Sequence, residues 1–460
     1  MIFASGIFLF WFLPALLLVY YGSPRAVRSL VIAGASYIFY GWWRPDFVAL
    51  MLISTVVDYW CGRRIATARD TQRPCRSWLL LSVCVSLGLL GYFKYANFGV
   101  DTLNALLAGM GMEAVGWTKV VLPIGISFYT FQTMSYTIDV YRGAAPPVGR
   151  FRDFMCYVAM FPQLVAGPIV RYRDVADQLR DRTHSWSRFY QGALLFECGL
   201  AKKLLIADVL DPVASLAFDG AAPGMLGAWT GLGAFTLQIY FDFSGYSDMA
   251  IGLGLMLGFR LPVNFDAPYR SRSITEFWRR WHISLSSWLR DYLYVPLGGN
   301  RRGPIRTYVN LGVTMLLGGL WHGANWTFMA WGAWQAAWLI VERLGGREAV
   351  WRRAPGVLRQ AACFLVVMLG WVWFRSADLG AAMDYFGALA GAGAGGPVPI
   401  APIHVVALVA GVVITFALPT SQQLAARDRL LWVIGVQLAF FIAILQLHAE
   451  DHVPFLYFQF

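Results

Sequence analysis

The sequence predicts an all-α protein, a bundle of helices that crosses a membrane many times. Its composition is the first observation: 58% of the 460 residues are hydrophobic, only 14% are charged, and the mean hydropathy is +0.54. A soluble domain carries about a quarter charged residues. The second observation is that apolar runs recur along the whole chain, many close to the ~20 residues that a membrane helix needs. We expect roughly 11–13 hydrophobic segments in a single integral membrane domain, residues 1–460.

The first apolar run, Ile2–Tyr21, contains no charged residue. It lacks a basic start and other runs follow closely, so we expect it to remain in the protein rather than be cleaved as a signal peptide. The further runs are Trp78–Phe93, Val120–Ile138, Leu226–Gln238, Val309–Ile340, Gln360–Phe374, His404–Leu418 and Leu430–Leu447.

One apolar stretch is interrupted. Phe154–Ile169 contains Pro162 and Pro168 and has arginines on both sides. This pattern predicts a re-entrant segment, which a membrane tolerates only where protein or a cavity shields the broken backbone.

The positive charge is distributed in clusters. Lys and Arg number 37 against 26 acids, a net charge of +11. Because the arginines lie between apolar runs, the positive-inside rule explains them better than nucleic-acid binding does. The loops 101–113, 211–224 and 378–402 hold few basic residues, so we expect them and both termini outside the cell. The clusters expected in the cytoplasm are Arg63–Arg76, Arg142–Arg152, Arg260–Arg306 and Arg343–Arg359.

Common enzyme motifs are missing from the sequence. It has no G-x-S-x-G elbow, P-loop or G-x-G-x-x-G pattern, and no His/Cys grouping with zinc spacing. We expect no bound cofactor and no metal. The six cysteines are scattered without a C-x-x-C pair, and we interpret them as small apolar side chains; they are Cys61, Cys75, Cys84, Cys156, Cys198 and Cys363.

His322 is the first candidate for chemistry. It lies in an apolar run, and an ionisable residue there suggests function. Gly318, Gly319 and Gly323 would let a helix or a substrate chain come close. A buried neutral imidazole can take a proton from a hydroxyl, which acyl transfer to an alcohol requires. The structural alternative is a neutral histidine that is hydrogen-bonded between helices.

His282 is the second candidate, in the tryptophan- and arginine-rich stretch Arg260–Arg306. Ser273 three residues before Glu276 indicates a capped helix start, and this composition suits a helix at the membrane boundary. On a continuous helix, Trp278, Ser286 and Leu289 would share the face of His282 while Asp291 would point away. His282 could therefore orient a substrate or simply bond to backbone.

A third cluster holds two acids in one apolar segment. Asp242 and Tyr246 are four residues apart and share a helix face, and Asp248 follows. Such acids must face protein or water. They could line a polar cavity, bind a cation or pair with a base, of which structural pairing is favoured. Lys202 and Lys203, in another apolar segment, are expected to pair or to extend toward water.

The stretch Trp278–Tyr292, with its motif Trp-Arg-Arg-Trp-His, resembles the signature of membrane-bound O-acyltransferases (MBOAT). The continuation Leu293–Asn300, the block Leu317–Trp326 and Tyr240–Asp248 look like the alginate O-acetyltransferase branch of that family. These motifs span residues 240–340 in the right order, and weaker similarity covers most of the chain.

The resemblance implies a helical bundle with a trans-membrane tunnel in a bacterial cytoplasmic membrane. It implies that His322 is the acyl-transfer histidine, that His282 is the second characteristic polar position, and that Asp242, Tyr246 and Asp248 line the tunnel. The acyl group, by this resemblance acetyl, would come from a cytoplasmic thioester such as acetyl-CoA. It would be used on an extracytoplasmic polysaccharide such as alginate, with a separate SGNH-type partner.

A non-enzymatic transporter or a scaffold of a polysaccharide export complex is the alternative from another class. Either would keep its function without His322. Arg279 and Arg280 could meet donor phosphates or lipid phosphates. The full set that we assign to donor or substrate binding is Arg279, Arg280, Trp281, Arg290, Asp291 and Asn325.

The C-terminal tail carries one more candidate. Phe455-x-Tyr457-x-x-Phe460 resembles the C-terminal motif of the small partner protein in bacterial teichoic-acid D-alanylation. That resemblance implies an acyl relay on the hydroxyl of Tyr457, since a phenol ester has a good leaving group. An aromatic anchor at the outer interface is the alternative.

Overall fold

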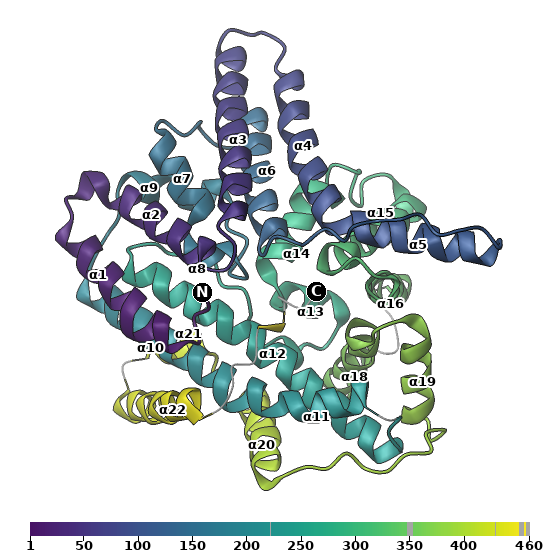
Figure 1. Ribbon diagram of the computed structural model, residues 1–460. Helices are drawn as coiled ribbons and strands as arrows, with labels where there is room; N and C mark the ends of the chain where they lie inside the picture. Colours follow the sequence, from purple (N-terminus) through teal and green to yellow (C-terminus); the bar gives the residue numbers. More distant parts are fainter. Residues whose placement is uncertain (221, 347–352, 428, 450–454, 457–460) are drawn as a thin grey trace. The chain divides into compact units, whose positions relative to one another are not determined.

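A computed structural model describes residues 1–220, 222–346, 353–427, 429–449 and 455–456. Over these residues the regular structure is entirely helical, which confirms the predicted all-α class (Figure 1). The chain divides into two compact units. The first comprises residues 1–192 and 253–262, and the second comprises residues 193–252 and 263–460.

The first unit contains the helices before residue 192. They are η1 (Phe8–Phe12), α1 (Leu13–Gly22), η2 (Arg25–Val27), α2 (Arg28–Gly41), α3 (Asp46–Asp70), α4 (Arg76–Leu90), η3 (Gly91–Tyr95), α5 (Ala96–Gly109), α6 (Ile126–Arg142), α7 (Phe151–Ala159), α8 (Phe161–Leu164) and α9 (Tyr172–Arg180).

The second unit begins within α10 (Trp186–Lys202) and holds most of α12 (Met225–Met256). Its other helices are η4 (Lys203–Ala207), α11 (Asp208–Asp219), η5 (Pro268–Arg270), α13 (Ile274–Arg280), α14 (Ile283–Leu289), η6 (Arg290–Tyr294), α15 (Gly303–His322), α16 (Trp326–Leu344), α18 (Gly356–Arg375), α19 (Leu379–Leu389), α20 (Pro402–Phe416), α21 (Ser421–Ala425) and α22 (Leu430–Ala449).

Three described helical stretches are long and apolar enough to cross a membrane: Arg76–Gly109, Gly356–Arg375 and Leu430–His448. Phe8–Gly22 and Pro402–Phe416 are shorter apolar helices. Other apolar runs are divided. Val309–Ile340, for example, is split between α15 and α16 by the turn at Gly323–Asn325. Among the described residues, fewer single helices are long and apolar enough to cross a membrane than the 11–13 hydrophobic segments expected from the sequence.

A buried polar cluster joins α3, α4 and α6 in the first unit. Asp58 is 1% exposed, and the hydroxyl of Ser82 donates to its Oδ1 at 2.6 Å. Ser82 also bonds Thr137 of α6 at 2.9 Å. Gly62 lets α6 approach, because a Cβ there would lie 2.3 Å from the ring of Tyr136. The buried carboxylate of Asp58 is therefore hydrogen-bonded within this cluster, as a low-dielectric interior favours.

The interrupted segment predicted to be re-entrant consists of two short helices. The chain leaves α7 at Met160 and starts α8 with Pro162 near its first turn. Every residue from 156 to 170 is buried. The amide of Phe161 donates to Ser36 Oγ at 3.0 Å, and Gln163 donates to the Tyr157 carbonyl at 2.5 Å. Protein thus shields the broken backbone, which is the condition that the sequence analysis set for such a segment.

In the second unit, α15 and α16 form a close antiparallel pair. A Cβ on Gly319 would lie 2.2 Å from the Phe328 carbonyl oxygen, and one on Gly332 would lie 2.5 Å from that of Met315. A Cβ on Gly323 would lie 2.0 Å from the Phe328 ring. The glycines around His322 therefore admit a partner helix, which is one of the two uses that the sequence analysis expected.

Candidate active site

His322 is the last residue of α15 and is 5% exposed. The helix ends there because Gly323 is extended and Asn325 caps the start of α16. Aromatic rings surround the imidazole: the ring centroids of Trp331 and Phe374 lie 5.1 Å and 5.3 Å from it. The neighbouring Trp321 ring is also 5.1 Å away. His322 thus lies in a largely apolar setting formed by α15, α16 and α18.

His282 does not lie within a helix, so the continuous helix expected around it is wrong. Helix α13 ends at Arg280, and α14 starts after His282, whose φ of +42° is left-handed. Trp278 and Ser286 therefore belong to different helices and share no face with it. Non-glycine residues rarely adopt this conformation. The sequence carries no proline or glycine at this point that would have marked the break.

The break gives His282 a defined tautomer. Its Nδ1 accepts a hydrogen bond from the Leu285 amide at 3.3 Å, which caps α14. A neutral imidazole has one donor and one acceptor nitrogen, so its proton is on Nε2. The residue is fully buried, and this burial lowers the pKa of His282 to about 3. His282 is therefore a neutral hydrogen-bond donor at physiological pH.

The fold brings the two histidines together although 40 positions separate them in sequence. Their ring centroids are 6.4 Å apart with an interplanar angle of 71°. Trp321 contacts both, with its centroid 5.8 Å from that of His282. Phe243 of α12 covers His282 at 4.7 Å. A neutral base and a neutral donor side by side in an aromatic enclosure can take a proton from a hydroxyl and polarise a carbonyl.

The acids of α12 are held in ion pairs. Lys203 Nζ lies 2.8 Å from Asp242 Oδ1 and 2.5 Å from Asp208 Oδ1. Lys203 and Asp208 are five residues apart, and the π-helical turn η4 places them together. Asp208, five residues after Lys203 in the same apolar segment, is thus one of the partners for the pairing that was expected of Lys203.

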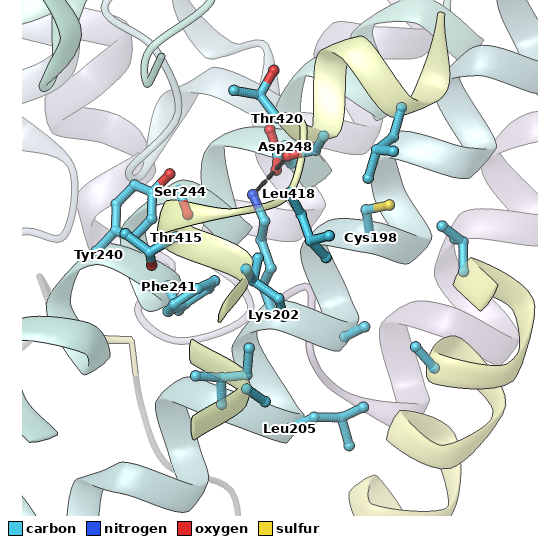
Figure 2. A pocket seen from close by; sticks show the side chains of 18 of the residues that line it. Cys198, Lys202, Leu205, Tyr240, Phe241, Ser244, Asp248, Thr415, Leu418 and Thr420 are labelled. Carbon is cyan, nitrogen blue, oxygen red and sulfur yellow. Dashed lines mark hydrogen bonds and ion pairs between the residues drawn. The ribbon is translucent and has the colours of Figure 1, made fainter. Parts of the chain in front are cut away.

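The second acid of α12 borders a cavity of about 550 Å³ (Figure 2). Lys202 Nζ lies 2.6 Å from Asp248 Oδ2, and Gln422 donates to Asp248 Oδ1 at 2.6 Å. The other lining residues of the cavity are mostly apolar and come largely from α10, η4, α12, α20 and α22, with Ser244, Arg270 and Gln446 as further polar ones. Phe265 also lines it, and the Phe265 ring centroid is 6.4 Å from that of His282. Both acids of α12 thus form ion pairs with lysines, and Asp248 also lines the cavity.

Tyr457 lies outside the described residues. Its neighbours Phe455 and Leu456 are described and buried. The Leu456 amide donates to Asp242 Oδ2 at 2.9 Å, and the Phe455 ring centroid is 4.7 Å from that of Tyr246. Phe455 is also 5.9 Å from Phe243, the ring that covers His282. This part of the tail packs against α12 on the side of the histidines.

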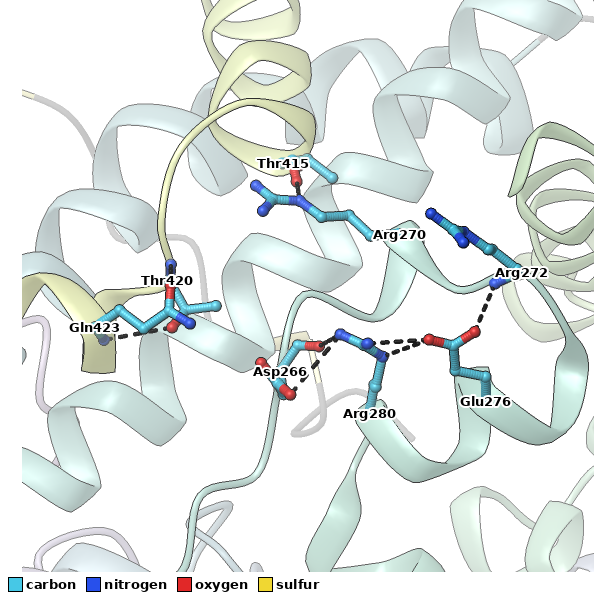
Figure 3. Close-up of polar contacts among 8 residues, drawn as sticks. All are labelled: Asp266, Arg270, Arg272, Glu276, Arg280, Thr415, Thr420 and Gln423. Carbon is cyan, nitrogen blue, oxygen red and sulfur yellow. Dashed lines mark hydrogen bonds and ion pairs between the residues drawn. The ribbon is translucent and has the colours of Figure 1, made fainter. Parts of the chain in front are cut away.

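The arginines assigned to the donor differ in their surroundings. Arg280 lies between Asp266 and Glu276 (Figure 3), with its NH2 2.9 Å from Glu276 Oε1 and its NH1 3.2 Å from the Asp266 carbonyl oxygen. Arg290 pairs with the adjacent Asp291 at 2.7 Å. Arg279 is exposed, and its side chain forms no ion pair with any residue that the structure describes. Of these arginines, Arg279 is the one free to meet a phosphate.

The two remaining donor candidates have structural contacts. Trp281 is 1% exposed, and its ring centroid lies 5.0 Å from those of Phe265 and Trp371. Asn325 accepts from the Thr327 amide at 3.2 Å and donates to the Ala377 carbonyl at 2.8 Å. Both residues support the loops that carry His282 and His322.

Comparison with known proteins gives a family for this arrangement. A model of the membrane-bound O-acyltransferase family matches residues 148–347, which include both histidines. The chain is 48% identical to the probable alginate O-acetylase AlgI of Pseudomonas putida over all of both chains. It is 52% identical to that of Pseudomonas aeruginosa over 85% of this chain and 75% of the relative. The peptidoglycan O-acetyltransferase of Helicobacter pylori is 34% identical over 85% of this chain and 80% of its own.

Proposed function

Because the chain belongs to the membrane-bound O-acyltransferase family, we propose that it moves an acetyl group from a cytoplasmic thioester to hydroxyls of an extracytoplasmic polysaccharide such as alginate. The chain is a multi-pass membrane acyltransferase. The acyl donor, the acceptor and the direction of transfer across the membrane are our proposals. The observation that carries it is the His282–His322 pair, with its ring centroids 6.4 Å apart inside the matched region.

The two histidines divide the chemistry between them. His322 accepts the proton of the attacking hydroxyl, whose oxygen forms a bond to the thioester carbonyl carbon. The Nε2–H of His282 donates to the carbonyl oxygen, which gains negative charge as the tetrahedral intermediate forms. The carbon–sulfur bond then breaks, and the proton on His322 passes to the leaving thiolate. A dry aromatic enclosure strengthens the hydrogen bond and keeps water from hydrolysing the thioester.

Acetyl-CoA is the acyl donor that we favour, because it is a thioester on a charged cytoplasmic carrier. Its phosphates cannot enter hydrocarbon, so they would stay near the arginine-rich stretch 260–306, where exposed Arg279 supplies a charge. This placement requires that stretch to be cytoplasmic and both termini to lie outside a bacterial inner membrane. Cysteine labelling in intact cells tests it: an impermeant reagent that modifies a Gly303→Cys variant would refute the orientation.

The names of the relatives support a choice of acceptor. Relatives named for alginate share about half of their residues with this chain, whereas the relative named for peptidoglycan shares 34%. Alginate is therefore the acceptor that we favour. A separate SGNH-type protein would complete the transfer outside the cell. Deleting such a partner should leave the thioesterase half-reaction of this chain intact while polymer acetylation is lost.

An acyl relay on the hydroxyl of Tyr457 would connect the reaction with the thioester to the transfer of the acyl group outside the cell. The burial of Phe455 and Leu456 beside Tyr246 and Asp242 supports a tail directed toward the histidines rather than toward lipid. Tyr457→Phe keeps the ring and removes only the nucleophile. Loss of polymer acetylation in this variant is the expected result, and normal acetylation would assign the tail to anchoring.

His322→Ala tests the central proposal. Removing a general base costs on the order of 10²–10⁴-fold in rate, so acetylation of the polymer should fall below detection while protein level and thermal midpoint stay normal. The exposed His448 provides the control, because His448→Ala removes the same group outside the site. Substantial acetylation by His322→Ala would point instead to a transporter or scaffold in polysaccharide export.

A further inference from the structure

The first unit contains a second cavity, about 470 Å³ in volume, with strongly basic walls. Its charged lining comes from the start of α2, the start of α7, the end of α9 and the segment that follows α9. Six arginines line it, and they are Arg25, Arg28, Arg150, Arg152, Arg180 and Arg182.

The positive charge of this cavity is not neutralised by the protein. Two carboxylates, Asp153 and Asp181, are the acids among its lining residues. Within the described part of the chain, neither forms an ion pair with these arginines at 4.0 Å or less. Arg152 Nε is buried and has no hydrogen-bond partner there. Arg28, Arg152 and Arg182 are half-buried and the other three arginines are exposed. Six guanidinium groups against two carboxylates leave the cavity with a net positive charge that attracts an anion.

One wall of the cavity is held rigidly. Arg182 NH1 donates to the Tyr20 hydroxyl at 3.3 Å, and its NH2 donates to Ser29 Oγ. The Tyr20 hydroxyl also bonds His184 Nε2 at 2.9 Å and the Leu257 carbonyl at 2.7 Å. Burial, and then the positive charges of Arg28 and Arg182, lower the pKa of His184. A neutral His184 adds a polar contact to the cavity without adding repulsion between cations.

Exposed apolar side chains lie close in sequence to the lining residues Arg25 and Arg28. Helix α1 ends at Gly22, three residues before Arg25, and exposes Leu18 and Val19 at 76% and 57%. Leu30, just beyond Arg28, is 44% exposed. A soluble ligand would gain nothing from these side chains, whereas a lipid could place its acyl chains along them.

We propose that this cavity binds the phosphate headgroup of an anionic phospholipid, with the acyl chains along α1. Guanidinium groups bind phosphate through paired, charge-assisted hydrogen bonds, and Arg is the preferred residue for that geometry. The volume suits a headgroup, since sites for small ligands measure about 300–1,000 Å³. The proposal concerns a site other than the histidine pair and does not depend on the acyl transfer.

Binding of a fluorescent phosphatidylglycerol to the purified full-length protein in neutral detergent tests the proposal. Arg152→Gln should weaken binding by about ten-fold, because it removes a charge-assisted hydrogen bond to the phosphate. The double variant Arg25→Gln/Arg150→Gln should do the same, and it keeps the fold because both residues are exposed and make no side-chain hydrogen bond within the described residues. Arg73→Gln/Arg76→Gln removes the same charge from the exposed α3–α4 loop and should leave affinity within two-fold.

Competition distinguishes the sources of phosphate. Unlabelled phosphatidylglycerol should displace the probe, whereas phosphatidylcholine, inorganic phosphate and coenzyme A should not at the same concentration. Equal affinity in the cavity variants and in the loop control would overturn the proposal. Displacement by coenzyme A or inorganic phosphate, lost in the cavity variants, would overturn it in favour of a soluble ligand.

Discussion

The histidine pair and the arginine cavity both gather residues from distant parts of the sequence, but they treat charge in opposite ways. His282 and His322 lie among aromatic rings with 0% and 5% exposure, where the neutral form is favoured. The arginines that line the cavity of the first unit are half-buried or exposed. A group that moves protons must be able to lose its charge, so burial suits it. A group that holds an anion must remain charged, so contact with water suits it.

A third arrangement lies between these two. Lys203, Asp208 and Asp242 are charged side chains that are buried, and the protein itself supplies their counter-ions. Variants in these arrangements distinguish groups that act on a substrate from groups that stabilise the fold, because the first should change the rate and the second the stability.

After His322, the largest effect on the reaction rate is expected at His282. His282→Ala removes the donor to the carbonyl oxygen, and the loss of one such donor costs about 10²–10³-fold in kcat. His282→Gln keeps an N–H donor and should recover part of the rate. Thioesterase turnover with acetyl-CoA measures both, and His184→Ala in the first unit should leave it unchanged. Equal rates for the Ala and Gln variants would mean that His282 only supports the backbone break.

A stability effect is expected at Lys203. Lys203→Met leaves Asp208 and Asp242 buried without their cation, and breaking a buried pair costs about 3–5 kcal/mol. Lys202→Met should cost less, because Asp248 keeps hydrogen bonds from Ser421 and Gln422. Thermal unfolding in detergent compares the two variants. A midpoint for Lys203→Met equal to that of Lys202→Met would contradict the distinction.

The smallest effect is expected at the surface arginines of α13. Arg279→Glu should raise KM for the donor by up to about ten-fold while kcat stays the same, since Arg279 is free to meet phosphates. Arg280→Glu should lower the thermal midpoint instead, because it places a second acid against Glu276. An unchanged KM in Arg279→Glu would assign that residue to lipid phosphate.

The sequence by itself determined the features that depend on composition and on near neighbours. Hydrophobic content gave the helical membrane class. The Ser273–Glu276 spacing gave the start of α13, where Ser273 Oγ accepts from the Glu276 amide at 3.1 Å. Gly319 gave the close approach of a helix. Each of these follows from contacts within a few residues or from the average polarity of a segment, so no knowledge of the fold was needed.

The tertiary structure alone decided which distant residues meet. It broke the helix at His282 in a left-handed conformation, although no local residue signals a break. Asn264 accepts hydrogen bonds from the Ile283 and Ser284 amides that follow, and Phe243 packs against the imidazole. It placed His282 beside His322, and it collected six arginines in one cavity. These outcomes rest on packing between distant segments: the two histidines are 40 positions apart, and the arginines of the cavity come from positions 25 to 182. Side-chain periodicity describes one helix at a time and carries no information about such contacts.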